Sequence, residues 1–142
     1  MEFTDKQLAF LNERHSAAMI TIGRDGTPKA VRVGVALVEG RLWSSGTRDR
    51  VRTRRLRRDP RSTLFVFDER YAFLTIEATV TLLDGADAAE KNLQLFRVMQ
   101  GRPSGPLTWY GEELDEDAFL ARMSAEGRLI YEFVPTHAYG LV

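Results

Sequence analysis

Tight turns between short apolar segments constrain the fold of this chain more than any other feature of its sequence. Arg24–Thr27, Glu39–Gly40 and Asp68–Arg70 each combine acidic or charged residues with few or no apolar ones, and the first two contain glycine, which tolerates positive φ. The segments on either side of each turn are rich in β-branched and aromatic residues. Because strands joined by such short turns pair as antiparallel neighbours, the sequence predicts a mainly antiparallel sheet.

The spacing of apolar residues places six strands and four helices along the chain. The expected strands are Ser16–Ile22, Pro28–Val38, Arg41–Ser45, Ser62–Phe67, Tyr71–Leu83 and Arg128–Val134. The expected helices are Thr4–Glu13, a short one ending before Pro60, Asp87–Gln100 and Glu112–Ala125. Closure of six antiparallel strands removes exposed edges, so we predict a mainly β (α+β) fold, with residues 1–142 forming one small barrel domain and helices at its rim. The residues expected in its core are Ile20, Ile22, Val33, Val35, Phe65, Leu74 and Ile76.

An arginine-rich segment, Trp43–Arg61, is the strongest candidate for a binding site. Nine of the 20 basic residues lie between positions 41 and 61, with only Asp49 and Asp59 as acids. The segment begins as a strand, breaks at small residues and continues as a helix, whose N-terminus attracts anions. The hydroxyls of the corner and its glycine suit a phosphate, and the corner residues are Ser44, Ser45, Gly46 and Thr47. A solvated charged face is the alternative reading.

Composition removes several classes of function. The arginine cluster could also bind the phosphate backbone of a nucleic acid, but the formal net charge of zero disfavours a nucleic-acid-binding module. The absence of cysteine excludes disulfides and thiolate chemistry, and with only His15 and His137 a histidine metal centre is not expected. We interpret His15 as a structural residue after the first helix. There is no apolar run long enough for a membrane span and no signal-peptide pattern, so we expect a cytoplasmic protein without membrane partners.

The order of motifs resembles the split β-barrel flavoproteins related to pyridoxamine phosphate oxidase. The likeness begins with Leu11–His15 and Asp25–Pro28 and extends over nearly the whole chain. It continues through Gly40–Ser45, Arg50–Arg61, Phe73–Thr79 and Pro135–Gly140. The arginine helix ending in Leu56-Arg57-Arg58-Asp59-Pro60-Arg61 is similar to the actinobacterial branch that uses a deazaflavin. A split barrel of the FMN-binding type is the fold that this resemblance implies.

The resemblance also implies a homodimer with two cofactor sites at its interface. The cofactor phosphate would lie at the strand-to-helix corner, bound by Ser45, Arg50 and Arg52, with Ser44, Gly46, Thr47, Arg48 and Arg55 nearby. The deazaflavin ring would lie along Val31, Arg32 and Val33. Coenzyme F-420 carries a phosphodiester and a polyglutamate tail, so a surplus of arginines favours it over FMN, whose single phosphate needs fewer.

Two features depart from the family pattern. Arg55 stands where an asparagine is usual, and the loop Gly105–Gly111 is not a general feature of the family. That loop is a candidate lid or substrate wall contributed by the partner subunit, although Trp109 and Tyr110 are equally explained by packing at a helix start. No catalytic residue is identified, and Tyr110 is only a weak candidate for donating a proton to a developing oxyanion. The carboxylates Glu112 and Glu113 are interpreted as solvated.

The expected function is hydride transfer from reduced F-420 to a small unsaturated organic acceptor. The alternatives are an FMN-dependent oxidoreductase of the same fold and a non-catalytic carrier of flavin, deazaflavin or haem. Spacing further predicts that Arg48, Arg52 and Arg55 share one helix face, along which the anionic tail would lie.

Overall fold

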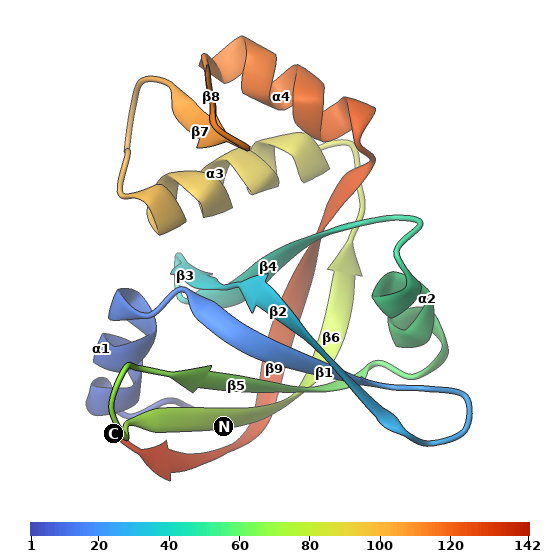
Figure 1. The fold of residues 1–142 in the computed structure, drawn as a ribbon, viewed down its shortest axis with the longest axis vertical. Helices are drawn as coiled ribbons and strands as arrows, with labels where there is room; N and C mark the ends of the chain where they lie inside the picture. Colours follow the sequence, from blue (N-terminus) through green and yellow to red (C-terminus); the bar gives the residue numbers. More distant parts are fainter.

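A computed structural model describes residues 1–142 and has nine strands, most of which form one strongly curled sheet (Figure 1). Seven strands form one antiparallel sheet in the order β2-β1-β5-β6-β9-β4-β3, and two more form a separate hairpin. The strands of the large sheet are β1 (Ser16–Ile22), β2 (Pro28–Gly34), β3 (Ala36–Val38), β4 (Arg41–Thr47), β5 (Arg61–Phe67), β6 (Phe73–Leu83) and β9 (Arg128–Leu141). The antiparallel split-barrel architecture predicted from the sequence is therefore confirmed.

The expectation of six strands is wrong by one in the large sheet, because the segment Pro28–Val38 is broken at Val35. The amide of Val35 donates to the carbonyl of His15 at 2.9 Å, and Nδ1 of His15 lies 3.0 Å from the carbonyl oxygen of Val35. These two contacts hold Val35 beside His15, just before β1. The residues that follow Val35 form β3, which pairs with β4 instead of β1. His15 thus has a structural role, as expected.

The last strand is twice as long as expected. β9 continues through Pro135 to Leu141, although proline cannot donate a hydrogen bond to a neighbouring strand. Its pairing with β4 ends at Phe133, so beyond this point the strand has only β6 as a neighbour. The register with β6 also shifts between Glu77 and Ala78, which is where Pro135 is accommodated. A proline is tolerated there because one side of the strand needs no donor.

Four helices surround the sheet, and none of them is long and apolar enough to cross a bilayer. α1 (Asp5–Glu13) begins with the capping box that Thr4 and Gln7 predict, α2 (Val51–Arg58) is the arginine helix and α3 is Ala88–Gln100. The helix expected over Glu112–Ala125 is shorter, because its first residues form a strand. β7 (Leu107–Trp109) and β8 (Glu112–Leu114) form a hairpin, and α4 (Glu116–Ala125) begins after the Asp115 cap.

The α3–α4 lobe, residues 88–125, stands over one end of the sheet (Figure 1). It has its own small core around Trp109 and Phe119, while the barrel interior is filled by side chains from eight helices and strands. Val33, Val35, Leu74 and Ile76 are buried in the barrel, as expected.

The burial expected for Ile20, Ile22 and Phe65 is wrong, since these three residues are only half-buried. They alternate with the buried Met19, Thr21, Leu64 and Val66, so they point to the outer face of the sheet.

Candidate functional site

The corner between β4 and α2 is fixed by a buried hydroxyl network. Oγ1 of Thr53 donates to the carbonyl of Thr47 at 2.7 Å and also hydrogen-bonds the hydroxyl of Tyr131. The Tyr131 ring lies directly against Gly46, where a Cβ would overlap its ring atoms. Arg50 is the N-cap residue in an extended conformation, so it stands outside the helix that begins at Val51. The corner is therefore fixed from the barrel side, where the guanidinium carbon of Arg52 also lies 5.7 Å from the centroid of the Tyr131 ring.

A cavity of about 320 Å³ opens between this corner, the end of β2 and the α3–α4 lobe. Its lining combines arginines with an apolar wall. The lining residues are Arg32, Val33, Gly34, Ser45, Arg50, Arg52, Phe96, Met99, Trp109, Tyr110 and Arg128. Seven of these residues were expected from the sequence to bind cofactor or substrate, and the fold brings them together from β2, β4, α2 and the β7–β8 hairpin.

Three of the lining arginines have no carboxylate partner. Arg32 makes one contact of 3.3 Å to Oγ of Ser16, whereas Arg50 and Arg52 form no ion pair. Nε of Arg52 is buried without any acceptor, and burial lowers the pKa of this guanidinium from its ordinary value, an effect the nearby Arg50 reinforces. A half-buried cation without a counter-ion is unfavourable, so this side of the cavity is suited to an anion.

The opposite wall is built around Arg128. Its Nε donates to Oε1 of Glu126 at 2.9 Å, and its guanidinium carbon lies 5.0 Å from the centroid of the Trp109 ring. Trp109 in turn donates from Nε1 to Oε2 of Glu126 at 3.0 Å. Ser45, which lies between the two walls, donates to Oδ1 of the buried Asn92 at 2.5 Å. The sheet and the lobe are thus joined by polar contacts directly beside the cavity.

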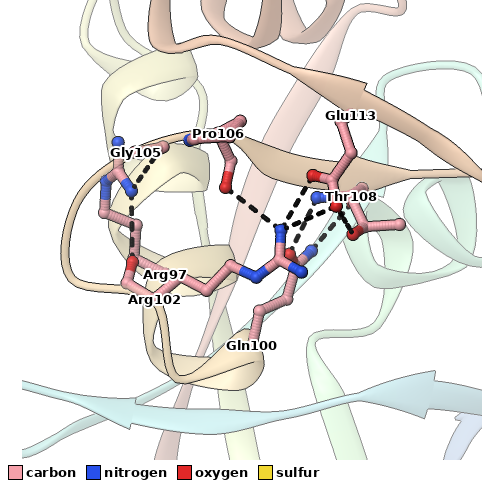
Figure 2. Close-up of polar contacts among 7 residues, drawn as sticks. All are labelled: Arg97, Gln100, Arg102, Gly105, Pro106, Thr108 and Glu113. Atoms are coloured by element: carbon pink, nitrogen blue, oxygen red, sulfur yellow. Dashed lines mark hydrogen bonds and ion pairs between the residues drawn. The ribbon is translucent and has the colours of Figure 1, made fainter.

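The β7–β8 hairpin that carries Trp109 and Tyr110 is tied to the end of α3 (Figure 2). The Gln100 side chain both accepts from the amide of Thr108 and donates to its carbonyl, each at 2.9 Å. Arg102 donates to Glu113 at 2.8 Å and to the carbonyl of Pro106 at 3.2 Å, and its hydrogen bond lowers the pKa of the Glu113 carboxyl. Glu113 is therefore exposed, as expected, and in addition is paired with Arg102.

Tyr110 and Trp109 differ sharply in exposure. Trp109 is 6% exposed and packs into the lobe core, while Tyr110 is 81% exposed at a positive φ of 48°, followed by Gly111 at 82°. This pair of positive φ values forms the two-residue turn between β7 and β8. Both aromatic residues line the cavity of their own chain. Trp109 also packs in the core of the α3–α4 lobe, so it has both of the roles considered from the sequence.

The remaining predicted site residues lie outside the cavity. Val31 is exposed on β2 outside the cavity. Ser44 is fully buried and donates to the carbonyl of Gly34 at 2.6 Å, and Thr47 donates to Asp49 at 2.9 Å. Gly46 is covered by the Tyr131 ring.

The prediction that Arg48, Arg52 and Arg55 share one helix face is wrong. The helix begins only at Val51, so the spacing from Arg48 does not follow helical geometry. Arg48 pairs with Asp84 at 2.6 Å, and Arg55 lines a separate groove of about 760 Å³ between α2 and the β1–β2 turn. That groove holds five cations, none in an ion pair, and one carboxylate, Asp25. Its cations are Arg24, Lys29, Arg54, Arg55 and Arg58.

Sequence reasoning missed Arg128 and the apolar wall of Phe96 and Met99. Arg128 follows Glu126 and Gly127 at the start of an apolar strand, and a cation ahead of a buried segment is a signal that could have been used. Gly34 is a point of close approach on the same side of the cavity, since a Cβ there would lie 2.9 Å from Sδ of Met99.

The family model for pyridoxamine 5'-phosphate oxidase matches residues 3–111, which include the barrel strands up to β6, the arginine corner and the first strand of the hairpin. This chain belongs to that family. Its fold is accordingly the flavin-binding split barrel.

Solved structures with the same fold cover nearly the whole chain at low identity. The Mycobacterium tuberculosis protein Rv2991 is 18% identical with a TM-score of 0.74, over 97% of this chain and 84% of that one. An F420 reductase is 19% identical with a TM-score of 0.68, over 96% and 98%. HutZ, the haem storage protein of Vibrio cholerae, is 15% identical with a TM-score of 0.66, over 99% and 95%.

Proposed function

We propose that this protein is an F-420-dependent oxidoreductase that passes a hydride to a small unsaturated organic acceptor. One observation carries the proposal: three arginines without carboxylate partners, Arg32, Arg50 and Arg52, line a single cavity. Nε of Arg52 is buried without a hydrogen-bond acceptor, which supports a site that is completed by an anion. A similar solved structure described as an F420 reductase supports the same cofactor class.

The cofactor fits the donor set of the cavity. A phosphodiester at the corner would accept from Arg50 and Arg52, whereas the Ser45 hydroxyl beside them already donates to Asn92. The ring would lie against Val33 and the backbone of Gly34. When bound, reduced F-420 supplies the hydride. The chain's own residues hold the ring at the floor of the cavity, while Phe96, Met99 and Trp109 limit the access of water. Tyr110 lies at the mouth and remains the only candidate proton donor.

The second groove favours a polyanionic cofactor over FMN. Val51 lines this groove, while its neighbours Arg50 and Arg52 line the cavity, so the two sites open on either side of the first turn of α2. A tail of glutamates leaving the corner would meet five cations there, whereas FMN has no group to reach them. FMN is the alternative cofactor if the groove is only a solvated surface.

A non-catalytic carrier is the second candidate, because a haem storage protein shares the fold. The arginines of the cavity would suit haem propionates. However, neither histidine lines the cavity: His15 is engaged by Val35, and His137 is exposed on β9 next to Tyr139. A haem in this cavity would therefore lack an imidazole ligand from the same chain.

We also propose that the protein acts as a homodimer. β2 is an edge strand, and its residues 28–32 are all exposed although they are part of the sheet. Val31 on this strand is an exposed apolar residue, and the outer face of the sheet carries further exposed apolar side chains at Phe67, Tyr139 and Leu141. Light scattering should give twice the 16.1 kDa mass of one chain, and a stable monomer at micromolar concentration would remove this part of the proposal.

Turnover is tested by mixing enzymatically reduced F-420 with the protein and a panel of quinone, enone and nitroaromatic acceptors. Reoxidation of the cofactor that requires both protein and acceptor is the expected result. Tight binding of F-420 without reoxidation by any acceptor would favour the carrier, and the same assay with reduced FMN separates the two cofactors.

A further inference from the structure

Arg128 is a nearly buried cation on the cavity wall that the proposed cofactor contacts leave unused. It is 7% exposed and begins β9 opposite Thr47 in the sheet. Its Nε is engaged by Glu126 at 2.9 Å, and Nη1 lies 3.5 Å from Oγ of Ser45, at the limit of a hydrogen bond. Since Nε is taken, the capacity left for a ligand is on the two Nη groups.

Glu126 fixes the orientation of this guanidinium. The same carboxylate accepts from Nε of Arg128 and from the indole Nε1 of Trp109, which holds the two side chains in a stack. A charge held by packing and hydrogen bonds on several sides loses little entropy on binding, so it is preorganised for a planar anion. Arginine pairs with a carboxylate through two parallel hydrogen bonds in such a geometry.

We propose that Arg128 binds the carboxylate of the acceptor, so that the substrates are conjugated compounds that carry a carboxylate. The conjugated body would pack against Phe96 and Met99, which form the apolar part of the same wall. This inference rests on the proposed function, because it names the class of acceptor for that reaction.

The balance of charge separates this site from the one for the cofactor phosphate. Arg50 and Arg52 have no counter-ion, which suits an anion that stays bound. Arg128 is partly neutralised by Glu126, so its attraction for an anion is weaker. A weaker site is appropriate for a ligand that must exchange at every turnover.

The test uses two probes of matched shape, cinnamate and its neutral amide, and follows the fluorescence of Trp109 in the full-length protein without cofactor. We expect cinnamate to bind at least about ten-fold more tightly than cinnamamide, as for a charge-assisted contact. Arg128→Gln should abolish this preference. Arg122→Gln, which removes an arginine paired with Glu112 on the surface of α4, should keep it. Trp109→Phe identifies the signal, because Trp43 is the only other tryptophan.

Arg128→Lys is a second variant, in case Arg128→Gln does not fold. It keeps the positive charge but lacks the planar guanidinium. It should give an intermediate preference, and thermal melting verifies that each variant is folded. Equal binding of the two probes by the wild-type protein would overturn the proposal. An unchanged preference for cinnamate in folded Arg128→Gln or Arg128→Lys would also overturn it. A variant that loses affinity for F-420 but keeps this preference would overturn it too, because Arg128 would then bind the cofactor. The probe preference is measured without cofactor, so a failure of F-420 binding leaves it a separate result.

Discussion

The guanidinium of Arg128 lies 5.0 Å from the centroid of the Trp109 ring, and Glu126 hydrogen-bonds both side chains. Arg128 belongs to the barrel sheet and Trp109 to the β7–β8 hairpin of the lobe. This contact therefore joins the two parts of the fold that enclose the cavity. The position of the aromatic wall relative to the arginine corner depends on it.

Arg52 should be the most sensitive cofactor contact. Because its guanidinium is half-buried beside the corner, Arg52→Ala should weaken F-420 binding by about ten- to a hundred-fold, the loss of one charge-assisted contact. Arg50→Ala should act in the same direction. Arg57→Ala is the matched control on the same helix, since Arg57 lies outside the cavity, 3.9 Å from Asp84. Isothermal titration of the variants measures the difference, and equal losses in Arg52→Ala and Arg57→Ala would contradict the assignment.

Arg52 should not stabilise the protein in the absence of cofactor. A half-buried cation without a counter-ion is unfavourable in the free protein, so Arg52→Met should melt at the same temperature as the wild type or higher. F-420 should raise the melting temperature of the wild type much more than that of the variant, because only a ligand that binds the folded state stabilises it. A strong drop in the melting temperature of ligand-free Arg52→Met would show that Arg52 is a structural residue.

The groove beside α2 should sense the length of the cofactor tail. Cofactor with more glutamates should bind more tightly at low salt, and the advantage should shrink as salt is added. Arg55→Gln combined with Arg24→Gln should reduce the dependence on length, because only three of the five groove cations remain, while leaving the binding of the tail-free deazaflavin unchanged. Fluorescence titrations with defined tail lengths measure this. A dependence of the same size in the wild type and the double variant would place the tail elsewhere.

Gly46 should not tolerate a side chain. A Cβ there would overlap the Tyr131 ring, which is fully buried and hydrogen-bonded to Thr53, so neither partner can move away. Gly46→Ala should lower the free energy of unfolding by about 1–3 kcal/mol, as overpacking does. Gly85→Ala is the control, because Gly85 is exposed and its nearest neighbour is one side-chain oxygen. Chemical denaturation compares the two, and equal effects would contradict this view of the corner.

The Arg102–Glu113 pair should make the hairpin sensitive to acid. Because the hydrogen bond from Arg102 lowers the pKa of Glu113, the pair adds stability above the ordinary glutamate pKa and loses it as pH falls through the lowered value. Glu113→Gln should therefore lower the melting temperature at pH 7 and make little difference at pH 3. A deficit of the same size at both pH values would show that the ion pair is not its cause.

The sequence was sufficient for elements whose signals are local. The capping box at Thr4 and Gln7 and the strand Ser16–Ile22 were predicted with their boundaries, because side-chain spacing alone determines them. The break at Val35 and the extension of β9 past Pro135 were not, because each depends on a distant partner. Val35 turns to meet His15, and Pro135 is accepted only where β4 no longer pairs with the strand.

The candidate site shows the same division. The position of Arg50 and Arg52 at a corner followed from the small residues before them and the helix after them. The roles of Arg48 and Arg55 did not, because Arg48 pairs with Asp84 and Arg55 lines the separate groove beside the β1–β2 turn. Arg128 was missed since its position beside Ser45 is created by strand pairing across 83 residues of chain.

The most direct measurement is a side-by-side equilibrium titration of the purified wild-type protein with F-420 and FMN at low and moderate salt. F-420 should bind more tightly, and added salt should weaken F-420 more than FMN, because the groove cations contact only the glutamate tail. Tighter binding of FMN, with equal salt dependence for the two cofactors, would contradict the assignment of the arginine cavity to a deazaflavin.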